Sequence, residues 1–150
     1  MIMAQVETTR RAADIGKVVC SGKTHTTGGR ENGVARSSDG RLDVRLSPPG
    51  SPRIGANPEQ LFAAGWSACF ETAIALAACK RGVDLGEVAI DAEVNLHLAE
   101  RDDYFLSAQL NVKLLGVDRG IAVQLVEDAE QLCPYSKATR GNIEVAINLL

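Results

Sequence analysis

The feature that most constrains this fold is one long segment that is apolar on nearly every side of a helix. It opens with Asn-Pro-Glu and is followed by a glycine, which predicts a helix from Pro58 to about Lys80, because asparagine caps free amides, proline fits the first turn and glycine ends helices. Between Leu61 and Cys79 it is rich in alanine, so other surfaces must enclose it. Glu71 in its middle and the small side chains argue against a membrane span.

The rest of the chain alternates polar and apolar residues in the manner of strands. The expected strands are 17–27, 41–46, 88–98, 106–114 and 143–149, and Asp118 is expected to cap a second helix that runs to about Leu132 with Ile121, Leu125 and Ala129 facing inward. The third and fourth strands read as a long antiparallel hairpin. This order, without a repeated βαβ unit, predicts an α+β fold with mainly antiparallel sheet. We expect one domain over residues 1–150, with 1–16 as a loose N-terminal arm.

Composition excludes several classes of protein. With 45% hydrophobic and 23% charged residues, the chain can build a core. A net charge of -3 gives no basic surface for nucleic acid. The N-terminus lacks the apolar run of a signal peptide, and the four cysteines are too few for a secreted disulfide scaffold, so we expect a cytoplasmic protein with no membrane partner. No CxxC pair is present, and we expect no metal site.

Two cysteines stand in segments of chemical interest. Cys133 precedes Pro134 and a short helical turn, where a helix N-terminus favours a thiolate; the residues alone leave a reactive role and a buried structural role equally open. Cys69 lies in the apolar helix, where burial without a positive partner raises the pKa of a thiol. Periodicity alone makes Cys69 a core residue.

The remaining cysteines and the histidines carry weaker hypotheses. Cys20 and Cys79 are most simply core or semi-buried small residues. His25 and His97 occupy outward positions in strands, where either could serve as the base of a Cys-His hydrolase. We regard that hydrolase as a minor alternative.

Three segments taken together resemble the organic hydroperoxide resistance (Ohr) branch of the Ohr/OsmC family. They are Gly28-Gly29-Arg30 with Ser38-Asp39-Gly40, NPEQLFAAGWSACFE from Asn57 to Glu71, and CPYSKATRGNI from Cys133 to Ile143. The resemblance extends over about residues 17–149, although Trp66 replaces an expected tyrosine and the loop between Leu46 and Asn57 is short. It implies two sheets wrapped around paired central helices in an intertwined homodimer.

The resemblance also implies roles for four residues. Cys69 would be the peroxidatic thiol, Cys133 the resolving thiol, Arg30 the cation that holds thiolate and peroxide, and Glu59 the acid that positions Arg30. The implied reaction reduces an organic hydroperoxide to an alcohol through a Cys69 sulfenic acid and a Cys69–Cys133 disulfide. No cofactor is implied, and the reductant would be dihydrolipoamide or a lipoylated protein.

The aromatic residues of the long helix have two interpretations. Phe62, Trp66 and Phe70 are first of all core packing, and secondly candidate walls of a pocket for alkyl or fatty-acid hydroperoxides. A different class of function stays open beside the peroxidase. It is a non-enzymatic stress-response or binding protein on the same fold, for which slow thiol alkylation and no peroxide turnover are expected.

Overall fold

The structure, a computed structural model, describes residues 16–150. The predicted N-terminal arm therefore lies outside the described residues, apart from Gly16. Along the chain the elements are β1 (Thr24–Thr27), α1 (Gly29–Asn32), β2 (Val34–Ser37), β3 (Asp43–Arg45), α2 (Pro58–Arg81), β4 (Val88–Leu98), a 3-10 turn (Glu100–Asp102), β5 (Tyr104–Leu114), α3 (Arg119–Leu132), α4 (Pro134–Thr139) and β6 (Glu144–Leu149). The predicted α+β class is confirmed.

Helix α2 begins and ends where the sequence predicts. The Asn57 side chain accepts a hydrogen bond from the amide of Gln60 at 2.8 Å, and the Gln60 side chain accepts one from the amide of Asn57 at 2.9 Å. This reciprocal capping box satisfies two amides that the helix leaves free. At the other end Gly82 adopts a left-handed conformation with φ 66°, which glycine reaches without strain.

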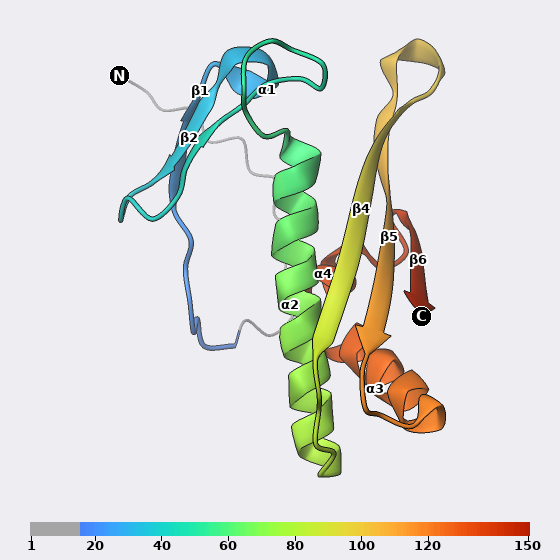
Figure 1. Ribbon diagram of the computed structural model, residues 1–150. Coiled ribbons are helices and arrows are strands. Elements are labelled where there is room, and N and C mark those ends of the chain that lie inside the picture. Colours follow the sequence, from blue (N-terminus) through green and yellow to red (C-terminus); the bar gives the residue numbers. More distant parts are fainter. Residues whose placement is uncertain (1–15) are drawn as a thin grey trace.

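Two three-stranded sheets flank α2. The small sheet has the order β1-β2-β3 and is antiparallel throughout, and the larger has the order β4-β5-β6. Figure 1 shows α2 between them, with the small sheet and α1 on one side and the β4–β5 hairpin on the other. The hairpin pairs Val88 with Leu114 and continues to Leu98 with Tyr104. Strand β6 pairs parallel to β5, so α3 and α4 form a crossover connection between them.

The core lies on one side of α2 only. Its largest fully buried members come from α2, β5, α3 and the α3–α4 junction: Trp66, Phe70, Ile74, Leu110, Val112, Leu125 and Cys133. The opposite face of α2 is exposed and mostly apolar, and it carries Ala64, Ala68, Ala75, Leu76 and Cys79. By length and composition α2 could cross a membrane, but in this fold its large side chains pack on the larger sheet, as in a core helix.

Several sequence predictions need correction. The first strand begins at Thr24 rather than at residue 17, and the short strand β2 was not predicted because four residues give too little alternation to detect. On α3, Leu125 and Ala129 are buried as expected, but Ile121 is exposed and Ala122, at 3% exposure, takes the expected place of Ile121 in the core.

Cys20 and Cys79 are also exposed rather than buried or semi-buried. Cys79 lies on the face of α2 that no other described element covers. Cys20 lies in the irregular segment before β1, outside any sheet. The expectation that both are core or semi-buried residues is wrong for the single chain.

Candidate active site

Helix α2 positions the first of two cysteines that the fold brings together. Cys69 stands three residues after Trp66 and one before Phe70, both of which are buried, and its own side chain is partly exposed. The helix is fixed at both ends by the caps described above and along one face by the core. Cys69 is thus held on a rigid element at the edge of the core.

The second cysteine is at the corner between α3 and α4. The amide of Cys133 donates to the carbonyl of Ala129 at 2.8 Å, and its carbonyl accepts from the amide of Lys137 at 3.0 Å. Pro134 then begins α4, because proline needs no partner at the first helical position. The Cys133 side chain is fully buried.

The two thiols meet although they are 64 positions apart in sequence (133 minus 69). Cys69 packs against the core cluster that contains Cys133, and Cys133 is near enough to raise the pKa of the Cys69 thiol. All four cysteines of the chain are free thiols. The structure therefore pairs Cys69 with Cys133, the two cysteines that the sequence motifs single out.

The surroundings of Cys69 in a single chain oppose its ionisation. Burial is the main cause that raises its pKa, and the charge and hydrogen bond of Cys133 raise the pKa further. The backbone amide of Tyr135, in the first turn of α4, donates to Cys69 and acts in the opposite direction. A further positive partner is needed before this thiol is a good nucleophile at neutral pH.

Arg30 and Glu59 form a second pair, as predicted, but at a different place along α2. Arg30 lies in α1 and its Nη2 donates to Oε1 of Glu59, in the first turn of α2, at 2.5 Å. The Glu59 side chain is only 15% exposed, and that of Arg30 is 43% exposed. Glu59 precedes Cys69 by ten residues of helix, about 15 Å along the axis. Within the described part of one chain, Arg30 does not influence the pKa of Cys69.

The three predicted pocket aromatics occupy different environments. Trp66 and Phe70 are 1% and 0% exposed and belong to the core. Phe62 is partly buried and lies edge-on to Trp66, with ring centroids 5.6 Å apart. Of the three, only Phe62 is not fully buried.

Sequence reasoning missed Tyr135 as a residue of this site. Its ring lies edge-on to Phe62 at 5.8 Å, and its hydroxyl closes over Gly65, where an added Cβ would stand only 2.8 Å from Oη. A glycine inside an otherwise alanine-rich helix is the sequence signal that could have indicated this close approach. Tyr135 thus reaches the site with its backbone near Cys69 and its ring one turn nearer the N-terminus of α2, at Gly65.

The other candidate residues stay apart from the thiol pair. His97 is exposed on the outer face of β4, where it contacts Ser107 Oγ at 2.7 Å and stacks on Phe105. His25 is exposed in β1. Neither histidine is among the groups that affect Cys69, and residues 16–150 contain no group of three or more potential metal ligands.

Comparison with known proteins gives consistent matches. A family model described as "OsmC-like protein" matches residues 48–148. The organic hydroperoxide resistance protein of Xanthomonas axonopodis pv. citri is 43% identical over 138 residues, 89% of this chain and 96% of that protein. Protein OhrA of Bacillus subtilis, with the same description, is 44% identical over 128 residues, 81% of this chain and 89% of that protein. The crystal structure of OhrB of Bacillus subtilis matches with a TM-score of 0.83 at 36% identity, covering 89% and 100% of the two chains.

Proposed function

Because the chain belongs to the OsmC-like family, and within it to the organic hydroperoxide resistance proteins, we propose that it is a cysteine-based peroxidase that reduces organic hydroperoxides to alcohols. The observation that carries this proposal is the pairing of Cys69 with Cys133. A peroxidase of this type needs one thiol to attack and another within reach to resolve the product.

The proposed reaction has two steps. The Cys69 thiolate attacks the outer oxygen of ROOH, the O–O bond breaks, the alcohol leaves after taking a proton, and Cys69 becomes a sulfenic acid. Cys133 then attacks the sulfur of the sulfenic acid, a disulfide forms and water leaves. The buried position of Cys133 beside Cys69 supports this second step.

We propose that the Arg30 guanidinium stabilises the Cys69 thiolate, and that it does so in a homodimer. In a single chain the small sheet has few buried residues and α2 leaves an apolar face exposed, and a second copy packed on these surfaces would cover both. We propose that this assembly brings an Arg30 guanidinium to Cys69, with Glu59 fixing its orientation through the bond already formed. A planar guanidinium held by a carboxylate is well suited to bind a thiolate and a peroxide oxygen.

We also propose a class of substrate and a reductant. Phe62 and the ring of Tyr135 give the approach to Cys69 an apolar character, which favours alkyl and fatty-acid hydroperoxides over hydrogen peroxide, at about 0.8 kcal/mol per buried methylene. Dihydrolipoamide or a lipoylated protein is the proposed reductant of the disulfide, and the cytoplasm the proposed location.

A stopped-flow assay tests the proposed function. Reduced protein is mixed with cumene hydroperoxide or hydrogen peroxide, and loss of thiols and formation of alcohol are followed, with dihydrolipoamide added for turnover. We expect rapid loss of two thiols per chain with cumene hydroperoxide and a far slower reaction with hydrogen peroxide. Slow thiol alkylation without peroxide consumption would instead support the non-enzymatic stress-response or binding protein.

A further inference from the structure

The corner that carries Cys133 is crossed by an ion pair that touches neither thiol. Cys133 is at once the last cap of α3 and the first cap of α4, with φ -64° and ψ 121°. Glu130 precedes it by three residues and Arg140 follows it by seven, so that the two lie on opposite sides of the corner. A bond between them therefore restrains the segment that presents the resolving thiol.

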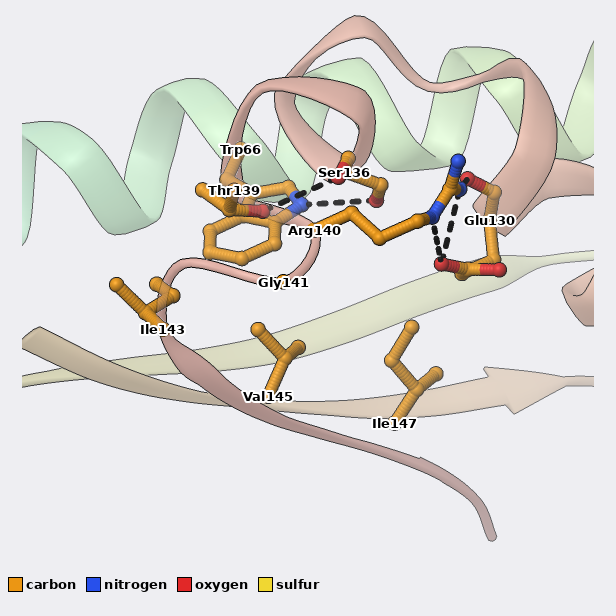
Figure 2. Close-up of a pocket in the computed structure, with 9 residues that line it drawn as sticks. All are labelled: Trp66, Glu130, Ser136, Thr139, Arg140, Gly141, Ile143, Val145 and Ile147. Carbon is orange, nitrogen blue, oxygen red and sulfur yellow. Dashed lines mark hydrogen bonds and ion pairs between the residues drawn. The ribbon is translucent and has the colours of Figure 1, made fainter.

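This bond has three components. Arg140 Nε and Nη2 donate to Oε1 of Glu130 at 3.1 and 3.0 Å, and Nη2 also donates to the backbone carbonyl of Glu130 at 2.7 Å. Figure 2 shows the Arg140 side chain extended towards Glu130. Because a guanidinium is planar and rigid, several bonds to one residue fix direction as well as distance. We call this arrangement the Arg140–Glu130 clamp.

Packing is incomplete on the side of α4 where Glu130 and Arg140 lie. A pocket of about 210 Å³ lies between α4 and β6, lined by Trp66, Ser136, Ile143 and Val145 among others. The contact between Trp66 Nε1 and Ser136 Oγ across it is long, at 3.4 Å. Interior side chains usually fill such space completely, so the clamp adds a restraint where the packing of α4 is loose.

We propose that the Arg140–Glu130 clamp is a positioning device for the resolving step, an inference that rests on the proposed function. In that step the Cys133 sulfur displaces hydroxide from the sulfenic sulfur of Cys69, the hydroxide takes the thiol proton, and water leaves. A disulfide demands a sulfur separation near 2.05 Å and a narrow range of torsion angles. A mobile α3–α4 corner would reach this sulfur separation and these torsion angles less often. The clamp therefore speeds disulfide formation without contacting a reacting atom.

Single-turnover kinetics separate this role from general support of the fold. In the Arg140→Ala variant, disulfide formation after one equivalent of cumene hydroperoxide should slow by about tenfold. The first step, measured as sulfenic acid formation in the Cys133→Ser background, should stay within about twofold of the unmodified rate. Trp66 is the only tryptophan and contacts α4, so its fluorescence reports the corner directly.

Matched variants complete the test. Arg81→Ala is the control, because Arg81 pairs with Asp128 at 2.5 Å at similar exposure but away from α4, and both steps should be unchanged. Glu130→Gln keeps the side-chain Oε1 and the backbone carbonyl as acceptors, so it should retain most of the rate of disulfide formation. Glu130→Ala removes Oε1 and should resemble Arg140→Ala. Thermal unfolding verifies that each variant is folded, and Arg140→Lys replaces Arg140→Ala if the latter is not.

Three results would overturn the clamp: an unchanged resolving rate in Arg140→Ala, equal slowing of both steps, or an equal effect of Arg81→Ala. Failure of the unmodified protein to consume hydroperoxide contradicts the proposed function instead. The two failures are therefore distinguishable in one set of experiments.

Discussion

At the scale of single residues, the proposed reaction depends on how readily Cys69 ionises. Burial raises its pKa in the single chain, and a cation within about 4 to 6 Å lowers a thiol pKa. In protein that keeps only Cys69, with serine at the other three cysteines, Arg30→Ala should move the alkylation profile above the ordinary midpoint of about 8.5. A higher pKa leaves less thiolate at neutral pH, so alkylation and peroxide reduction there should both slow.

Rates of alkylation by iodoacetamide, measured between pH 6 and 10, give this profile. That range extends about two pH units to either side of the midpoint of an ordinary thiol. The pKa of Cys69 in Arg30→Lys should lie between the values in the protein with Arg30 and in Arg30→Ala, because an ammonium keeps the charge and loses the planar fork. Glu59→Ala should be milder, since it removes orientation alone. An identical profile in Arg30→Ala would exclude Arg30 from the site and leave the Tyr135 amide as the ionising contact.

A second prediction divides the work between the two thiols. Cys69→Ser should lose all reaction with organic hydroperoxide, because no other thiol occupies its position beside Cys133. Cys133→Ser should reduce one equivalent and stop as a sulfenic acid, since attack and resolution are separate steps. Dimedone labelling with mass spectrometry detects the stalled species. Normal turnover of Cys133→Ser with a dithiol would contradict the intramolecular disulfide.

A third prediction concerns Gly65. An alanine there places a methyl group 2.8 Å from the Tyr135 hydroxyl, so the tyrosine ring must move or α2 must shift, at a cost of about 1–3 kcal/mol. Gly65→Ala should lower the denaturant midpoint, and Tyr135→Phe, which removes the clashing oxygen, should restore part of the loss. If the double variant is no more stable than Gly65→Ala alone, the contact with the Tyr135 hydroxyl is not what disfavours a larger side chain at position 65.

The sequence predicted the cysteine pair better than its surroundings. Cys69 and Cys133 were identified by the two motifs, and the bond between Arg30 and Glu59 exists as expected. Trp66 and Phe70 are buried as their expected core packing predicts, whereas the exposure of Cys79 could not be predicted, because a helix apolar on every side gives no indication of which face meets the sheet. Tyr135 was missed for the same reason, since its place depends on how α4 packs on α2.

At the scale of elements, the N-terminal cap of α2 supports the helix that carries Cys69. Asn57→Ala removes the bond to the Gln60 amide and should destabilise the protein by about 1 kcal/mol. Asn57→Ser keeps an accepting oxygen and should cost much less. Urea unfolding of both variants measures the difference, and equal stability of the two would show that this cap contributes nothing.

Elements with strong local signals were predicted and short ones were not. The β4–β5 hairpin alternates over eleven residues in each strand and was correctly placed. Strand β2 and helix α1 contain four residues each, too few for a periodic pattern. The parallel pairing of β6 with β5 is a matter of topology, which alternation within a strand cannot indicate.

At the scale of the whole molecule, the exposed apolar face of α2 is the surface to test for dimerisation. Leu76 is 47% exposed on that face, and an aspartate there would place an unpaired charge in the proposed interface, which is strongly unfavourable. Leu76→Asp should therefore give monomers by light scattering and lose peroxidase activity at neutral pH. Val123→Asp, on the exposed side of α3 at 41% exposure, is the control. A Leu76→Asp protein that stays dimeric would place the interface elsewhere.

The arrangement of the small sheet was the part least accessible to sequence reasoning. Strands β1 and β3 are exposed along most of their length in the single chain, and β2 buries only Ala35, so their patterns do not identify the surface they pack on. Only the family resemblance supplied the expectation of an intertwined pair. Residue patterns describe a chain, and a surface shared between two chains has no local signature in either.

The crossover between β5 and β6 has a consequence for biosynthesis. Cys133 lies in that crossover, and β6, which closes it, is the final strand of the chain. A growing polypeptide can form α2 and the hairpin early, because their contacts are close in sequence, whereas the parallel pairing must wait until β6 has been made. The crossover that carries Cys133 is therefore closed later than the helix that carries Cys69, so the two thiols take up their positions at different stages of folding.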